Sequence, residues 1–184
     1  MSLPRRTVLI AVAAAPLALD VAVAQQPPIG LRLVRRVGWQ DLMGQKRCVV
    51  GDLYRSDPGF PASALGAKVC NVLELAYRNK ANELVPIPRG DYEGVVTADG
   101  PRGWRIELKG AADRSGNKPN ERSNIQLHIG SRPSDAIGCI VPLIADADAA
   151  DASCANVATR PAMDRLRTAI GGSANRKVLL RVQT

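Results

Sequence analysis

The chain is short of the residue types that metal centres and nucleic-acid sites use most. It has one histidine, and aromatic residues make up 3% of the sequence. No two cysteines have the C-x-x-C spacing of common zinc sites, and the combination of His128, Asp135, Cys139 and Cys154 matches no metal motif. Proteins that bind single-stranded nucleic acid stack bases on aromatic side chains, which are scarce here despite a formal net charge of +8. We therefore expect no metal, no cofactor and no nucleic-acid partner.

A hydrophobic run long enough to span a membrane is also lacking. The most apolar stretch, Thr7–Leu19, is too short for a span and is interrupted by Pro16. It follows two arginines and precedes the A-x-A cleavage site Ala22-Val23-Ala24, so residues 1–24 are predicted to be a signal peptide. The paired arginines suit the twin-arginine route as well as ordinary secretion. We expect a periplasmic or secreted protein with no membrane span after cleavage.

After a linker at residues 25–30, residues 31–184 are enough for one β-rich domain with a single core. Short apolar or alternating stretches predict strands, and one amphipathic stretch that follows a proline predicts a helix. The expected strands are Leu31–Val37, Lys46–Tyr54 with a bulge at Gly51, Lys68–Tyr77, Tyr92–Thr97, Trp104–Leu108, Ile125–Ile129, Ile137–Val141 and Lys177–Val182, the expected helix is Ala162–Ile170, and Trp39–Gly44 is expected to be a turn. The predicted fold is mostly β: a single antiparallel β domain, as a sandwich or partly open barrel, with one C-terminal helix.

The four cysteines, Cys48, Cys70, Cys139 and Cys154, would reach a compartment that permits disulfides. Four cysteines allow three pairings, and the spacing does not choose among them. Cys48 and Cys70 both lie in predicted strands, so a bridge between neighbouring strands is one option. Cys139 and Cys154 would then form a second bridge or remain free thiols.

The stretch Ile125–Pro142 holds the only histidine, His128, and the Cys139 thiol, in two predicted strands joined by a turn-rich loop. A thiol becomes a nucleophile as the thiolate, and a nearby imidazole promotes that form. In this interpretation a backbone N–H near Gly138 stabilises the oxyanion, and Ser134 or Asp135 orients the ring. The competing interpretation is that Cys139 is a buried or bridged structural cysteine and His128 a hydrogen-bonded strand residue.

Three short motifs occur in a fixed order: I-P-x-G-x-Y at Ile87–Tyr92, H-x-G at His128–Gly130 and G-C-I at Gly138–Ile140. Together they resemble a β-rich domain family of unknown function in bacterial and phage proteins, and the similarity covers roughly Cys48 to Val141. More distantly, the same order resembles the catalytic domain of L,D-transpeptidases (the YkuD-like domain).

The second resemblance implies a cysteine nucleophile, Cys139, preceded by Gly138, with His128 as the base. It also implies a substrate-binding surface, for which Tyr92, Arg132 and Ser134 are the candidates. Ile137 stands where that family has a second histidine, and Val141 where it has an arginine.

The expected function is therefore a cysteine-dependent, L,D-transpeptidase-like enzyme that acts on peptidoglycan stem peptides. The alternative is a non-catalytic module that binds anionic cell-envelope polymer, which the basic charge balance favours.

Overall fold

The computed structural model describes residues 26–36, 40–42, 46–56, 65–78, 84–99, 103–109, 125–130, 138–143 and 160–183. Its strands are β1 (Ile29–Arg35), β2 (Gln40–Leu42), β3 (Lys46–Arg55), β4 (Lys68–Leu75), β5 (Tyr77–Arg78), β6 (Leu84–Val85), β7 (Gly90–Thr97), β8 (Arg105–Lys109), β9 (Ile125–His128), β10 (Ile140–Pro142) and β11 (Lys177–Gln183), and its helix is α1 (Arg160–Ile170). The predicted signal peptide and the predicted loop residues Arg132, Ser134 and Asp135 lie outside the described residues.

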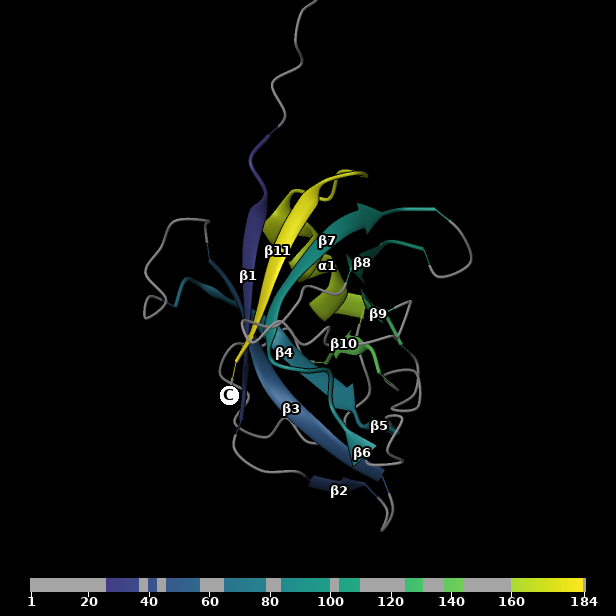
Figure 1. Cartoon of the computed structure of the whole chain (residues 1–184). Coiled ribbons are helices and arrows are strands. Elements are labelled where there is room, and N and C mark those ends of the chain that lie inside the picture. Colours follow the sequence, from purple (N-terminus) through teal and green to yellow (C-terminus); the bar gives the residue numbers. More distant parts are fainter. Residues whose placement is uncertain are drawn as a thin grey trace, which may run out of the picture.

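Eight strands close into a barrel in the order β1-β11-β7-β8-β9-β10-β4-β3, because β3 also pairs with β1 (Figure 1). The short β2 extends the sheet at the edge of β3, and β5 pairs with β6 separately. The prediction of a mostly β domain with a C-terminal helix is confirmed for the described part of the chain. The expectation of a sandwich or partly open barrel is wrong, because pairing between β1 and β3 leaves no gap in the ring.

Two of the barrel's strand pairs are parallel, β1 with β11 and β9 with β10, and the other six are antiparallel. The expected antiparallel domain is therefore only partly correct. Three local predictions also differ from the structure. The first strand begins at Ile29, inside the predicted linker, and β2 occupies part of the predicted turn at Trp39–Gly44. The irregularity in β3 lies between Leu53 and Tyr54, not at Gly51.

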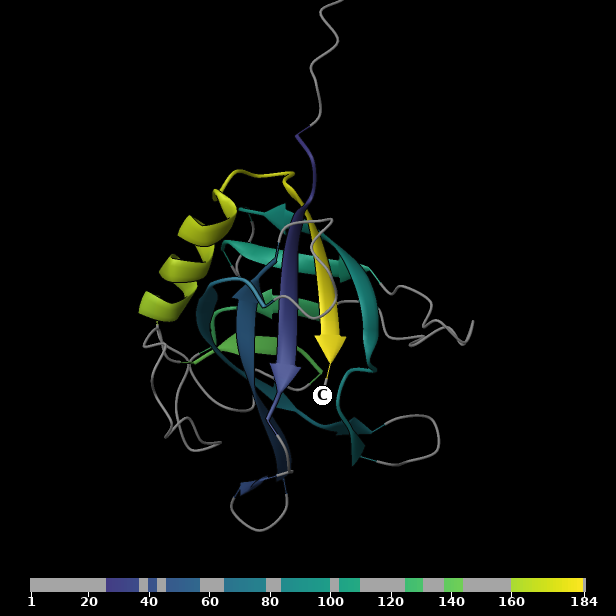
Figure 2. The ribbon, with the colours of Figure 1, turned by 90° about the vertical axis from the view of Figure 1, so that its left-hand side faces the viewer.

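The barrel interior is built from alternate residues of each strand, as the two-residue period of a strand requires. Leu33, Leu53, Val72, Ile106 and Leu127 are among the buried side chains of this apolar cluster. The buried face of α1 (Ala162, Met163, Leu166 and Ile170) joins the same cluster. The helix therefore completes the core by packing against one end of the barrel (Figure 2). No helix in the described ranges is long and apolar enough to cross a membrane.

Gly94 occupies an interior position of β7 where a side chain would not fit. A Cβ atom there would lie 2.8 Å from Ile106 Cγ2 and 3.1 Å from Leu108 Cδ2. We expect Gly94→Ala to lower the free energy of unfolding by about 1–3 kcal/mol, because overpacking a filled interior forces its neighbours out of place. Urea denaturation measures this change. Glu93→Ala, at the adjacent outward position, should change stability by less than about 0.5 kcal/mol. Equal stabilities of the two variants would show that the interior accommodates the methyl group.

Candidate functional site around His128 and Cys139

The parallel pair β9–β10 brings His128 and Cys139 near each other. Ile140 pairs with Leu127, and both belong to the barrel interior. Because side chains alternate along a strand, His128, the residue after Leu127, lies on the outer face. Cys139 directly precedes β10 and lies two residues away from His128 along the neighbouring strand, and no hydrogen bond joins Nε2 of His128 to the Cys139 thiol.

The imidazole of His128 is held in one tautomer. Its Nδ1 lies 2.7 Å from the carbonyl oxygen of Ile129. A carbonyl can only accept a hydrogen bond, so Nδ1 carries the proton and Nε2 of the neutral ring carries a lone pair. His128 is 5% exposed, and its Nε2 is buried without a hydrogen-bond partner among the described residues. Most buried side-chain polar atoms are hydrogen-bonded. An unsatisfied acceptor on the only histidine therefore points to a catalytic role or to a bound ligand.

Cys139 forms no disulfide and is 8% exposed. The preceding Gly138 has φ 68°, a left-handed conformation that side chains disfavour, and it turns the chain into β10. The N–H of Gly138 donates to the carbonyl of Leu75 at 3.2 Å and so continues the pairing of β10 with β4. The sequence suggested a backbone N–H near Gly138 as an oxyanion donor, and the N–H of Gly138 is one of the candidates. In the structure it is already engaged, so Gly138 positions the cysteine instead.

Cys70, which also forms no disulfide, lies in the barrel interior opposite Leu53. Burial raises the pKa of Cys70 to about 12, against smaller opposing effects from the positive charges of Arg165 and Lys68. Cys70 is therefore a thiol, not a thiolate, at neutral pH.

Because neither Cys70 nor Cys139 forms a disulfide, two suggested bridges are excluded, Cys48 with Cys70 and Cys139 with Cys154. Cys48 is not among the free thiols. Cys154 lies outside the described residues.

Tyr92, expected to contact substrate, lies in the barrel interior and is 1% exposed. Its hydroxyl donates to the carbonyl of Pro88 at 2.6 Å. Ile87, in the same segment, is also buried, and its carbonyl accepts a hydrogen bond from Arg35. The motif at Ile87–Tyr92 is thus a structural element of the barrel, and a substrate would have to open the core to reach Tyr92.

An ion pair inside the barrel was not anticipated from the sequence. The guanidinium of Arg35 in β1 donates to both carboxylate oxygens of Glu74 in β4, at 2.9 and 2.8 Å, and both side chains are buried. Glu74 pairs with Ile140, the residue after Cys139. A charged residue at an inward position of an alternating strand, as in Leu31, Leu33 and Arg35, is the signal that would have revealed the pair.

A second charged cluster lies on the outer face of β3 and β4. Asp52 Oδ1 accepts from Arg36 at 2.9 Å, from Asn71 at 2.6 Å and from Lys68 at 3.0 Å. Burial raises the pKa of Asp52, but the hydrogen bonds and charges of Arg36 and Lys68 outweigh it, and the net pKa lies below its usual value. The carboxylate is satisfied by the protein itself, so this cluster is structural.

The candidate site therefore consists of the Cys139 thiol, which forms no disulfide, and the imidazole of His128, brought near each other by the pairing of β9 with β10. Comparison of the chain with protein-family models, with curated proteins and with solved structures finds no match in any of the three.

Proposed function

We propose that the protein is an exported thiol-dependent acyl transferase of the L,D-transpeptidase type, acting on peptidoglycan stem peptides, with Cys139 as nucleophile and His128 as base. The observation that supports the proposal is the Nε2 of His128, which has no hydrogen-bond partner among the described residues, on the strand beside Cys139, which forms no disulfide. A lone pair without a protein partner, on a ring fixed through Nδ1, is what proton abstraction from a thiol requires. The motif resemblance adds the substrate class.

In this mechanism Nε2 of His128 takes the proton of the Cys139 thiol, directly or through one water. The thiolate attacks a peptide carbonyl carbon, and a C–S bond forms. The imidazolium then donates its proton to the amide nitrogen, the C–N bond breaks, and the free amine leaves a thioester on Cys139. A second amine, or water, attacks the thioester, gives up its proton to His128, and releases the acyl group with restoration of the thiol.

The thioester is the species that tests the proposal. We expect intact-mass spectrometry of the mature protein, incubated with peptidoglycan stem peptides and quenched in acid, to detect an adduct of the acyl mass. Peptide mapping should locate it at Cys139. The matched variant Cys70→Ala should form the same adduct, and Cys139→Ala should form none.

The same experiment separates catalysis from binding alone. If wild type and Cys139→Ala bind peptidoglycan fragments equally, and neither exchanges an amine nor forms an adduct, then the catalytic proposal fails. The non-catalytic module that binds anionic envelope polymer would then be the remaining function.

A further inference from the structure

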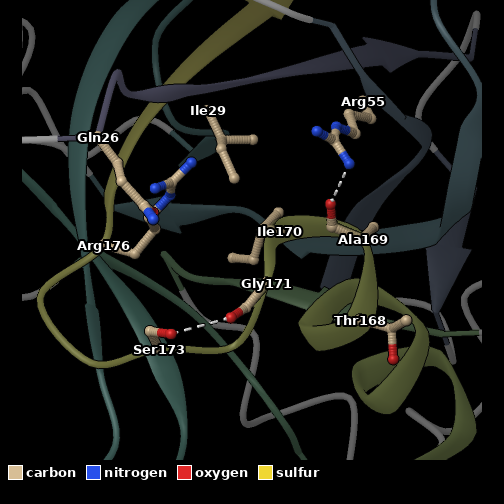
Figure 3. Close-up of a pocket in the computed structure, with 9 residues that line it drawn as sticks. All are labelled: Gln26, Ile29, Arg55, Thr168, Ala169, Ile170, Gly171, Ser173 and Arg176. Atoms are coloured by element: carbon tan, nitrogen blue, oxygen red, sulfur yellow. Dashed lines mark hydrogen bonds between the residues drawn. The ribbon is translucent and has the colours of Figure 1, made fainter.

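A cavity of about 350 Å³ opens at the end of the barrel where the C-terminus of α1 meets the start of β1 and the end of β3 (Figure 3). Neither His128 nor Cys139 lines it. Its lining combines apolar side chains with polar side chains from three separate parts of the chain. The lining residues are Gln26, Ile29, Arg55, Thr168, Ala169, Ile170, Gly171, Ser173 and Arg176.

Among the described residues, the lining has a positive charge, because it includes two arginines and no acidic residue. Arg55 has a structural partner at the site, since its Nη1 donates to the carbonyl of Ala169 in the last turn of α1, at 2.8 Å. Cationic side chains commonly satisfy the carbonyl groups at a helix C-terminus, so this contact accounts for the position of Arg55.

Arg176 has no such explanation. Its Nη1 is buried and lacks a hydrogen-bond partner among the described residues. A buried cationic donor without an acceptor is costly, and an anion in the adjoining cavity would remove that cost.

The backbone that carries Arg176 is held firmly. The turn between α1 and β11 has three residues with positive φ, Gly171 at 80°, Gly172 at 56° and Asn175 at 63°. The N–H of Asn175 donates to Val96 at 2.8 Å, and the indole of Trp104 donates to Gly172 at 3.1 Å. A binding site whose backbone is already ordered in the absence of ligand loses less conformational entropy when the ligand binds.

We infer that this cavity binds a phosphate group through Arg55 and Arg176. A phosphate monoester carries a charge of about −1.5 to −2 near neutral pH, which matches two guanidinium groups, and guanidinium forks suit its oxygens. The hydroxyls of Thr168 and Ser173 are further donors at the rim. The volume exceeds that of an inorganic ion, so the phosphate is carried on an organic body, either a small phosphorylated polyol or a segment of a polyol-phosphate polymer.

Isothermal titration of the mature protein with glycerol 1-phosphate and with a short poly(glycerol phosphate) tests this inference. Both should bind saturably. Arg176→Gln and Arg55→Gln should each weaken binding about tenfold or more, because each removes a charge-assisted interaction. Arg176→Lys keeps the charge and loses the planar, bidentate guanidinium. Its affinity should lie between those of wild type and Arg176→Gln. Tighter binding of the monoester indicates a small metabolite, and tighter binding of the polymer indicates an envelope polymer.

The matched control is Lys177→Gln, which removes the same charge from the next residue, outside the cavity. It should change the affinity less than twofold. The inference is overturned if neither compound binds saturably, or if Lys177→Gln weakens binding as much as Arg176→Gln. Thermal unfolding of each variant checks that it is folded, and Arg176→Lys keeps the test decisive if Arg176→Gln is unstable. Because these readouts do not use Cys139, their failure leaves the proposed acyl transfer untouched.

Discussion

Glu74→Ala should lower the free energy of unfolding by about 3–5 kcal/mol, because it leaves the buried guanidinium of Arg35 without its carboxylate partner. Glu74 accepts two hydrogen bonds from Arg35, and the same guanidinium also donates to the carbonyl of Ile87. An arginine stays protonated in proteins, so the variant cannot relieve the unpaired charge by losing a proton. Urea unfolding measures the loss.

The chain offers a matched control on its surface. Arg181 and Asp91 form a pair of the same bidentate geometry, at 2.6 and 2.9 Å, but both side chains are well exposed. Asp91→Ala should therefore cost no more than about 1 kcal/mol. The double variant Arg35→Met/Glu74→Leu, which removes both charges, should recover most of the stability lost in Glu74→Ala. If Glu74→Ala costs as little as Asp91→Ala, then the interior pair does not stabilise the barrel as we expect.

Arg35→Met should behave differently from Glu74→Ala as the pH changes. Burial raises the pKa of Glu74, and the hydrogen bonds and charge of Arg35 oppose that rise. Without Arg35 the opposition is lost, so the folded state should hold the Glu74 proton to a higher pH than the unfolded state does. The stability of Arg35→Met should then be greatest below the ordinary glutamate pKa of about 4.3 and fall as the pH rises through the raised value. Glu74→Ala has no carboxyl group at this position, so its own stability should show no such gain at acid pH.

Three strands could be predicted from the sequence with the help of a two-residue period of burial along them. β7, β8 and β11 each alternate buried and more exposed residues, and their predicted ranges agree with the structure within two residues at each end. The helix was predicted within two residues for the same reason, since Met163, Leu166 and Ile170 face the core. Gly171 and Gly172 follow its last residue in left-handed conformations, which commonly end helices.

Barrel closure could not be predicted, because it depends on which distant strands pair. The parallel contact of β1 with β11 joins residues about 150 positions apart in the chain, and no local pattern encodes it. The same limit applies to the cavity. Arg55 and Arg176 lie far apart in the sequence, and neither belongs to a motif, so only the packing of α1 on the barrel brings them together.

The motifs named candidate site residues without showing how the fold places them. His128 and Cys139 lie near each other because β9 and β10 are parallel and adjacent, which a pair of short apolar stretches does not specify. Tyr92 and Gly138 belong to the same motifs, yet one fills the core and the other pairs with Leu75. A motif residue that alternates in phase with buried neighbours, as Tyr92 does with Gly94 and Val96, is more safely assigned to packing.

Alkylation of the native protein with iodoacetamide at pH 7 should modify Cys139 at least a hundredfold faster than Cys70. With a pKa of about 12, Cys70 has a thiolate fraction of about one in 10⁵ at this pH, whereas an ordinary thiol with a pKa of about 8.5 has a few per cent. Cys70 is also fully buried, while Cys139 retains some exposure. Peptide mapping by mass spectrometry gives the two rates separately, and alkylation of the denatured protein should modify both residues equally.

The contribution of His128 is read from the same measurement. If Nε2 accepts the proton of Cys139, then alkylation of wild type should stay fast at a lower pH than alkylation of an ordinary thiol. In His128→Gln the rate at pH 7 should fall about tenfold or more, and the pH profile should move to that of an ordinary thiol, because the nearby base that favours the thiolate is gone. Cys70→Ala should leave both the rate and the profile unchanged. A Cys139 rate equal to that of Cys70, or a profile that His128→Gln does not move, would make Cys139 a structural cysteine, and the acyl-transfer proposal would lose its nucleophile.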